Sequence, residues 1–194
     1  MIEKVLYIHG FNSSPLSMKA ELTKQYLASH FPAVQFCCPQ LLSSPDAAIA
    51  QLEEIIQAEP NVKWGVIGSS LGGYFSQYFA EKYRYPAVLV NPAIKPYLLL
   101  ADYIGWQVNP YTDERYEVKA EHMDYLKSVE QEKISANLYQ VMVQTGDEVL
   151  DYRLAKEKFS GSDLIVQEGG DHSFIGFAEM LPSICEFFDQ KAPN

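Results

Sequence analysis

The sequence predicts an α/β domain in which a mostly parallel sheet is covered by helices on both faces. Short runs rich in β-branched and apolar residues alternate with longer segments of helical period along the 194 residues. Most of the short runs are apolar throughout, which is typical of strands that are buried on both faces. A chain of this length matches one domain, and we expect that domain to span residues 1–194.

The short runs give the strands of the predicted sheet. Each lies between turn residues and is rich in residues that favour strands. Six are predicted, over residues 5–9, 34–38, 64–68, 87–91, 140–145 and 163–167.

The segments between the strands carry the period of helices and provide the crossovers that parallel strands need. A start signal is visible at Ser44 and Pro45, because proline is favoured in the first turn of a helix. The predicted helices are residues 17–31, 46–58, 71–84, 152–159 and 174–191.

One connection, residues 92–138, is far longer than a crossover requires. It mixes charged residues with aromatic ones, so it is predicted to be an insertion that forms a small helical cap over the sheet. Its aromatic residues are Tyr97, Tyr103, Trp106, Tyr111, Tyr116 and Tyr125.

Composition narrows the classes of partner. Hydrophobic residues make up 47% and charged residues 21%, values typical of a soluble globular protein. Fifteen Lys and Arg against 25 Asp and Glu give a net charge of −10, which repels phosphate backbones and anionic lipids. We therefore expect no nucleic-acid partner.

Cysteine use and hydropathy predict a cytoplasmic protein. Cys37, Cys38 and Cys185 cannot all pair, so no disulfide framework is expected. No apolar run approaches the roughly 18 residues of a membrane span. Residues 1–4 lead directly into the first strand, where a signal peptide would need a basic head.

The strongest chemical signal is the segment Gly68-Ser69-Ser70-Leu71-Gly72, between a predicted strand and a predicted helix. This is the G-x-S-x-G pattern in the context where it places a serine on a sharp strand-to-helix turn. Ser70 is therefore the candidate nucleophile. A glycine-rich turn without chemistry, or a phosphate cradle, is the alternative, although neither a P-loop Lys-Ser/Thr nor a G-x-G-x-x-G segment is present.

A serine nucleophile needs a base within hydrogen-bond reach and an acid to orient that base. His172 is the best candidate base, because it lies in a polar glycine-rich loop directly after the last predicted strand. His30 falls in a predicted surface helix and His122 in the insertion, so both are expected to be solvated.

Three carboxylates follow the fifth predicted strand and compete for the role of the acid. Asp147 is closest to the strand end and is preferred, with Asp151 and then Glu148 as alternatives. All three also fit as acids at the N-terminus of the helix that follows.

The first predicted strand ends in His9-Gly10-Phe11, a second glycine turn at the same edge of the sheet. In a serine hydrolase such a turn donates one N–H to the oxyanion, here that of Phe11, and the residue after the nucleophile, Leu71, donates the other. His9 would then brace the loop. An ordinary β-to-α turn is the alternative.

With these segments the sequence resembles α/β-hydrolase fold proteins. The matching residues are His9-Gly10, 68–73, 146–149 and 169–174, in the chain order serine, acid, histidine. Residues 6–15, 91–94 and 144–152 are similar to small bacterial esterases called YqiA-like, and the resemblance covers nearly the whole chain.

The resemblance implies a three-layer α/β-hydrolase fold with a six-stranded, mostly parallel sheet and the second strand at an edge, since this chain begins at the His-Gly strand. It implies a serine hydrolase, a carboxylesterase or thioesterase that cleaves small acyl esters or acyl-CoA thioesters through an acyl-enzyme, without a cofactor. Ser70, His172 and Asp147 would form the triad, with Phe11 and Leu71 at the oxyanion. Leu98, Tyr103 and Trp106 of the cap would contact the acyl chain, unless these side chains only cover the sheet.

Two other functions stay open from sequence. The fold can carry a non-catalytic ligand-binding or interaction protein, and the same triad also serves peptidases and acyltransferases. No metal site is expected, because the four histidines are scattered and the cysteines lack CxxC spacing.

Overall fold

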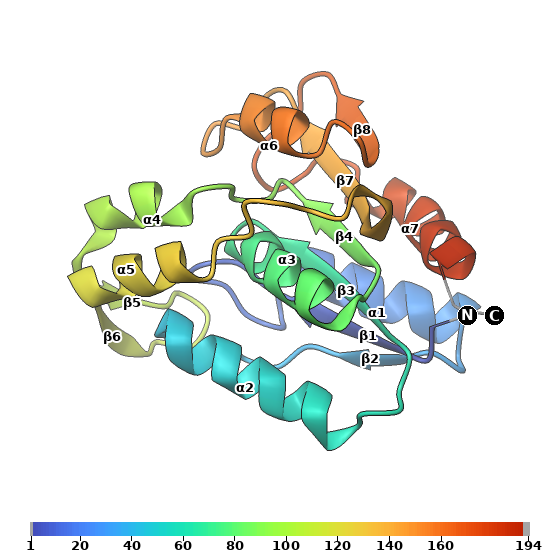
Figure 1. Ribbon diagram of the computed structural model, residues 1–194, viewed down its shortest axis with the longest axis horizontal. Coiled ribbons are helices and arrows are strands. Elements are labelled where there is room, and N and C mark those ends of the chain that lie inside the picture. The colour runs from blue at the N-terminus through green and yellow to red at the C-terminus, as the bar shows by residue number, and fades with distance from the viewer. Residues whose placement is uncertain (1, 192–194) are drawn as a thin grey trace.

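A parallel sheet runs through the centre of the molecule in the computed structural model, which describes residues 2–191 (Figure 1). Over that range it has six strands in the order β2-β1-β3-β4-β7-β8, and every neighbouring pair is parallel. The predicted fold class is confirmed, with β2 at an edge. The strands are β1 (Lys4–Ile8), β2 (Gln35–Cys37), β3 (Trp64–Ser69), β4 (Ala87–Val90), β7 (Tyr139–Gln144) and β8 (Asp163–Gln167).

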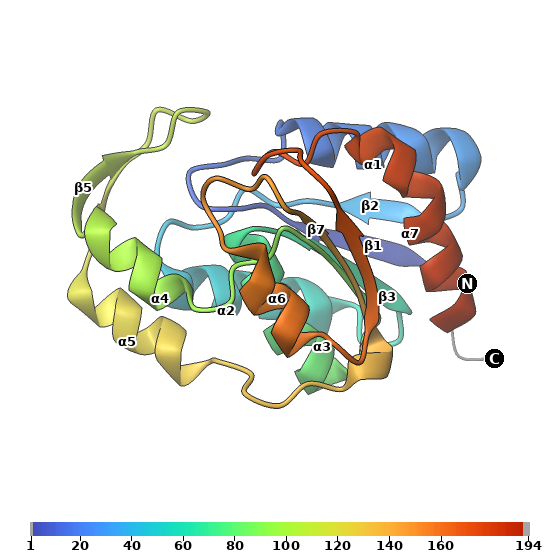
Figure 2. The ribbon, with the colours of Figure 1, turned by 90° about the horizontal axis from the view of Figure 1, so that it is seen from above.

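Helices cover both faces of this sheet (Figure 2). On one face lie α1 (Met18–His30) and α7 (Phe177–Lys191), which pack against each other. On the other face lie α2 (Pro45–Ala58), α3 (Leu71–Tyr83) and α6 (Tyr152–Lys158). The result is the three-layer arrangement expected when strands are apolar on both sides.

The last helix begins later than the sequence pattern predicts. It starts at Phe177 instead of residue 174, because Phe174 and Gly176 adopt positive φ angles of 66° and 78° that end helical geometry. Among the helices of residues 2–191, none has both the length and the apolar character needed to cross a membrane.

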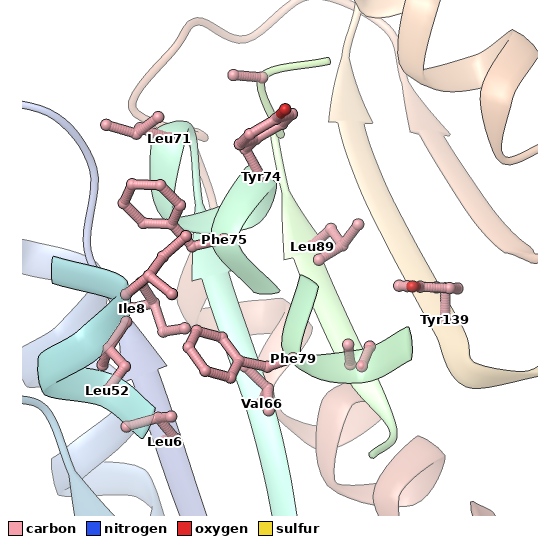
Figure 3. Close-up of a cluster of buried hydrophobic side chains, with 14 of the residues drawn as sticks. Leu6, Ile8, Leu52, Val66, Leu71, Tyr74, Phe75, Phe79, Leu89 and Tyr139 are labelled. Atoms are coloured by element: carbon pink, nitrogen blue, oxygen red, sulfur yellow. The ribbon is translucent and has the colours of Figure 1, made fainter. Parts of the chain in front are cut away.

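The core on the α3 face fixes the turn at the start of α3. Phe75 and Phe79 project from α3 onto Leu6 and Ile8 of β1, and Leu52 of α2 closes the cluster (Figure 3). All five side chains are fully or almost fully buried. Because close packing of this kind resists displacement, the first turn of α3 is held firmly against the end of β1.

The insertion lies at one end of the sheet and contains a β-hairpin that the sequence analysis did not predict (Figure 2). The hairpin strands are short and half exposed, so their sequence lacks the long apolar run of a buried strand. In chain order the segment contains α4 (Pro96–Leu99), the 3₁₀ helix η1 (Leu100–Tyr103), β5 (Gly105–Val108), β6 (Arg115–Val118), α5 (Ala120–Ser128) and the 3₁₀ helix η2 (Ala136–Leu138).

Polar contacts tie the hairpin to the turn that follows β1. The Tyr116 hydroxyl donates to Asn12 Oδ1 at 2.5 Å, and Asn109 Nδ2 donates to the carbonyl oxygen of Ser13 at 3.0 Å. The ring of Phe11 packs edge-on against Tyr103, with 5.4 Å between ring centroids. The insertion is thus attached directly to the loop that carries one of the predicted oxyanion donors.

Candidate active site

Ser70 lies on the sharp turn between β3 and α3. Its backbone angles, φ 55° and ψ −120°, are in a region that residues with a side chain rarely adopt. The strand ends at Ser69 and the helix begins at Leu71, so Ser70 is the single residue of the turn. This geometry sets the hydroxyl at the carboxyl end of the sheet, above the surrounding backbone.

Close backbone contact explains the glycine at position 72. A Cβ atom there would lie 1.9 Å from the carbonyl oxygen of Ile8 and 2.6 Å from that of His9. The first turn of α3 therefore rests directly on the end of β1, which only glycine permits. This contact brings the Gly10-Phe11 turn beside Ser70.

The imidazole of His172 faces the Ser70 hydroxyl. His172 Nε2 and Ser70 Oγ are 3.1 Å apart, although 102 positions separate the two residues in the chain. On the other side of the ring, Nδ1 lies 2.8 Å and 3.0 Å from the two carboxylate oxygens of Asp147. A carboxylate only accepts hydrogen bonds, so Nδ1 carries the proton and Nε2 accepts from the serine hydroxyl.

Asp147 is set up to remain ionised. Its side chain is only 2% exposed. Burial raises the pKa of this carboxyl, but hydrogen bonds from His172 and from the backbone N–H groups of Leu150 and Val149 outweigh burial and leave the pKa below its ordinary value. Those N–H groups donate to Oδ1 at 2.8 Å and 2.9 Å. The carboxylate is therefore charged and fixed in orientation at neutral pH.

The other two candidate acids occupy different positions. Asp151 caps the N-terminus of α6, where its carboxylate accepts from the backbone and the guanidinium of Arg153. Glu148 Oε2 accepts from the backbone N–H of His172 at 3.0 Å and does not contact the imidazole. Of the three carboxylates, the structure brings only Asp147 to the ring, and Glu148 holds the histidine backbone.

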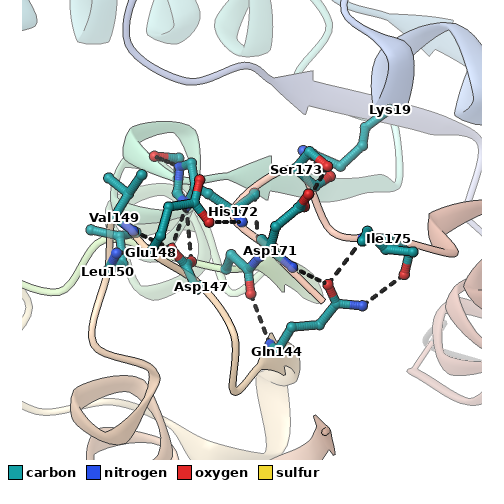
Figure 4. Close-up of polar contacts among 12 residues, drawn as sticks. Lys19, Gln144, Asp147, Glu148, Val149, Leu150, Asp171, His172, Ser173 and Ile175 are labelled. Carbon is teal, nitrogen blue, oxygen red and sulfur yellow. Dashed lines mark hydrogen bonds and ion pairs between the residues drawn. The ribbon is translucent and has the colours of Figure 1, made fainter. Parts of the chain in front are cut away.

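Gln144, the last residue of β7, supports the His172 loop from below (Figure 4). Its Oε1 accepts from the backbone N–H groups of Asp171 at 3.1 Å and Ile175 at 3.0 Å, and its Nε2 donates to the carbonyl oxygen of Ile175 at 2.7 Å. A Cβ at Gly170 would lie 1.9 Å from the same Oε1, so the loop passes directly over the amide. This buried amide fixes both sides of His172.

Asn91, directly after β4, connects the strand ends to the same loop. Its Nδ2 donates to the carbonyl oxygens of Asp171 at 3.0 Å and His172 at 3.3 Å, while its Oδ1 accepts from the backbone N–H of Gln144. The sequence pattern predicts no role for Asn91 or Gln144. The available signal was a polar residue at the end of an otherwise apolar strand, where the chain reaches the edge of the sheet.

Phe11 and Leu71, the predicted oxyanion donors, both belong to turns at Ser70. Leu71 is the first residue of α3, so its N–H has no acceptor in a preceding helical turn. Within residues 2–191 neither N–H is taken by a backbone acceptor. The turn before Phe11 is also close, since a Cβ at Gly10 would lie 3.2 Å from the Ser70 Cβ.

A hollow of about 740 Å³, open to solvent, contains the serine and the histidine. We call it the serine groove. Its lining combines the Ser70 hydroxyl and the His172 imidazole with further hydroxyl groups, one ammonium group and one carboxylate. The lining residues are Tyr7, His9, Gly10, Phe11, Ser13, Ser17, Lys19, Ser69, Ser70, Glu148, His172 and Ser173.

A second hollow, of about 560 Å³ when the open solvent at its mouth is included, shares His9, Gly10 and Phe11 with the serine groove and extends under the insertion. We call it the cap pocket. Both the sheet domain and the insertion contribute apolar side chains to its lining, and both also contribute polar side chains. Its apolar lining includes Phe11, Leu41, Leu71, Phe75, Leu100, Val118 and Met123, and its polar lining includes Gln40, Asn109, Tyr116 and His122.

The three cap residues predicted to contact substrate have different surroundings. Tyr103 is 47% exposed and packs edge-on against Phe11, which lines both hollows. Leu98 and Trp106 are 64% and 61% exposed, and none of the three residues is among the lining residues of either hollow. Substrate contact by these side chains stays a prediction. The pocket-lining Leu100, Val118 and Met123 were missed, because burial within a short insertion cannot be deduced from local pattern.

The sheet order, the layers and the serine turn define this chain as an α/β hydrolase in fold, and solved structures support that class. This chain is similar to mouse alpha/beta hydrolase domain-containing protein 10 at 13% identity and a TM-score of 0.77, and the match covers 97% of this chain and 90% of the mouse chain. It is also similar to a soluble variant of the monoglyceride lipase of Saccharomyces cerevisiae, solved with a substrate analogue, at 13% identity and a TM-score of 0.70, over 100% and 88% of the two chains.

A third similar structure is Est1E from Butyrivibrio proteoclasticus with bound ferulic acid, at 12% identity and a TM-score of 0.70, over 97% of this chain and 88% of that one. These matches confirm the α/β-hydrolase resemblance. At the level of sequence, residues 4–189 match one family model, and the chain belongs to that family, the uncharacterised protein family UPF0227.

Proposed function

We propose that this protein is a serine hydrolase that cleaves carboxylic esters or acyl thioesters through an acyl-enzyme intermediate. The observation that carries the proposal is the continuous hydrogen-bonded chain from the Ser70 hydroxyl through the His172 imidazole to the buried Asp147 carboxylate. A structural role alone does not require a nucleophile in strained backbone geometry, a base in contact with it and an ionised acid behind that base. Structures of an esterase and a lipase with the same fold agree with this class of reaction.

In the first half of the proposed reaction Ser70 Oγ attacks the acyl carbonyl carbon while His172 Nε2 takes the serine proton. The carbonyl oxygen becomes an oxyanion that accepts hydrogen bonds from the N–H groups of Phe11 and Leu71. The imidazolium then gives its proton to the departing alcohol or thiol, and the acyl group remains on Ser70. Asp147 holds the ring in orientation and stabilises its positive charge throughout.

In the second half His172 takes a proton from water, whose oxygen attacks the acyl carbon. Collapse of this intermediate breaks the acyl–serine bond and returns the proton to Ser70, which releases a carboxylic acid. No cofactor is needed, because every proton moves between the triad, the substrate and water. The cap pocket beside Phe11 and Leu71 is the apolar space that adjoins both oxyanion donors, so we assign the acyl chain to it.

Ser70→Ala tests the proposal. Purified Ser70→Ala protein should lose about 10⁴-fold or more in kcat on p-nitrophenyl esters and on acyl-CoA thioesters of graded chain length. A fluorophosphonate probe should label the unmodified protein and fail on the variant. Ser128→Ala is a suitable control, because that serine lies on α5 and lines neither hollow. Unchanged ester turnover in Ser70→Ala would rule out the mechanism.

The same panel separates the remaining possibilities. The ratio of thioester to oxyester turnover distinguishes a thioesterase from a carboxylesterase, and an added amine or alcohol acceptor reveals acyl transfer. Peptide substrates test for peptidase activity. Absence of both labelling and turnover in the unmodified protein would favour a non-catalytic ligand-binding role on the same fold.

A further inference from the structure

A lysine ammonium group lies in the serine groove close to the proposed catalytic residues. Lys19, in the first turn of α1, lines the groove together with Ser70 and His172, and Figure 4 shows its side chain reaching toward the His172 loop. Among the groove-lining residues that the structure describes it is the only lysine or arginine. The lining also holds one carboxylate, that of Glu148.

The ammonium group of Lys19 makes one hydrogen bond to the described part of the protein. Within residues 2–191 it donates one hydrogen bond, to the carbonyl oxygen of Ser173 at 2.8 Å, although an ammonium group has three donors. Burial lowers the pKa of Lys19, and the charges of Asp171 and Asp147 offset part of that effect. A partly desolvated cation with donors to spare gains free energy when an anion joins it.

The carboxylates nearest to Lys19 are engaged elsewhere. Asp147 accepts from the His172 ring, Glu148 accepts from the His172 backbone, and Asp171 accepts from the Ser173 hydroxyl. None of them forms an ion pair with Lys19 by direct contact. The groove lining also includes Ser13 and Ser17, whose neutral hydroxyls suit a polar ligand.

The proposed reaction decides which part of a substrate lies here. The imidazolium must give its proton to the departing oxygen or sulfur atom, so the leaving group lies on the His172 side of Ser70. That side is the serine groove, whereas the acyl chain is assigned to the apolar cap pocket. Lys19 therefore faces the alcohol or thiol portion of the substrate.

We propose that Lys19 forms an anion-binding subsite for the leaving group, so that the preferred substrates are esters or thioesters whose alcohol or thiol portion carries a carboxylate or a phosphate. This inference rests on the proposed function, since it uses the direction of proton transfer in that mechanism. It assigns Lys19 to substrate selection and leaves bond cleavage to the triad.

Matched aryl esters test the subsite. The neutral ester is methyl 4-acetoxybenzoate, the carboxylate ester is 4-acetoxybenzoate, and the phosphate ester is 4-acetoxyphenyl phosphate. For each protein, the ratio of kcat/KM on a charged ester to kcat/KM on the neutral one is measured. In Lys19→Met at least one of these ratios should fall about five- to tenfold, as expected for loss of a partly exposed charge-assisted hydrogen bond. Lys19→Arg should recover most of the ratio.

The use of a ratio separates substrate recognition from support of the His172 loop. If Lys19 only held the Ser173 carbonyl oxygen, its replacement would lower turnover of all three esters equally and leave both ratios unchanged. Lys24→Met is the control, because Lys24 lies on the same helix but pairs with Glu21 at the surface. The midpoint of thermal unfolding confirms that each variant is folded.

Each result decides the inference. A selective loss on the carboxylate ester, the phosphate ester or both supports the subsite and shows which anion it prefers. Equal losses, or unchanged ratios in Lys19→Met, overturn the subsite and leave the proposed hydrolase intact. Failure of the unmodified protein to cleave any of the three, together with no fluorophosphonate labelling, overturns the proposed function and with it the subsite.

Discussion

The carboxyl edge of the sheet and the insertion at residues 92–138 are built in different ways. At the sheet edge, buried amides fix the loop of His172, and Asn91 and Gln144 are almost completely buried. The insertion instead has short elements and a hairpin on which Trp106 and Val108 are exposed. A precise reaction geometry needs the first kind of construction, and a surface that adapts to different substrates can use the second.

The largest loss of activity is expected at the sheet edge, from replacement of the acid of the proposed triad. Asp147→Asn should lower kcat on esters by about 10⁴-fold, because an amide at this position favours the wrong tautomer of His172. Asp151→Asn should change kcat less than about twofold, since Asp151 contacts Arg153 at the start of α6. Steady-state kinetics on one p-nitrophenyl ester measures kcat for both variants. Equal losses would contradict the assignment of the acid.

These two aspartates also show how far the sequence could lead. The serine, the histidine and a carboxylate could be placed at one edge because the carboxyl ends of parallel strands meet there. The choice among three carboxylates depends on a tight turn in which the N–H groups of Val149 and Leu150 hold Asp147, and no periodicity encodes that turn. The supporting amides were missed because tertiary contacts define their role, whereas the hairpin was missed because its short, half-exposed strands lack a long apolar run.

The amide of Gln144 should be the next most sensitive feature. Gln144→Leu leaves the backbone N–H groups of Asp171 and Ile175 without their acceptor, which should lower the free energy of unfolding by about 2–4 kcal/mol. Displacement of the His172 loop should also reduce kcat about tenfold. Urea denaturation and ester kinetics measure the two effects.

Gln140→Leu provides the matched control for this prediction. Gln140 lies on the same strand at its opposite end, where it donates to Asp163 and Ser183. Its replacement should cost about 1–3 kcal/mol of stability and leave kcat within about twofold. If both variants lost activity to the same extent, loop support by Gln144 would not explain the kinetic effect.

A pH-dependent loss of stability is expected from His9, whose ring lies in the wall shared by the two hollows. Its Nε2 accepts from the backbone N–H of Leu41 at 3.1 Å and its Nδ1 donates to the carbonyl oxygen of Gly10 at 3.0 Å, so the ring is held neutral. Burial lowers the pKa of His9, in spite of the hydrogen bond to Gly10.

The unfolded chain therefore binds a proton to His9 more readily than the folded protein does. The free energy of unfolding should decline as the pH falls below about 6.5, the ordinary pKa of histidine, and the decline should level off below the lowered pKa of the folded state. Urea denaturation between about pH 5 and about pH 8 should show a flatter profile in His9→Gln.

The smallest effect is expected on the outer face of the insertion, at Trp106. Its indole is largely exposed and its main partner is the guanidinium of Arg115, 4.6 Å from the ring centroid. Trp106→Ala should change the free energy of unfolding by about 0.5–1 kcal/mol, in line with an exposed cation–π contact. Kinetics on esters of graded chain length then decide its role in binding. Selectivity that changes less than about twofold would assign acyl selection to the buried cap pocket, whereas a selective loss on long chains would show that substrate reaches this outer face, as the sequence predicts.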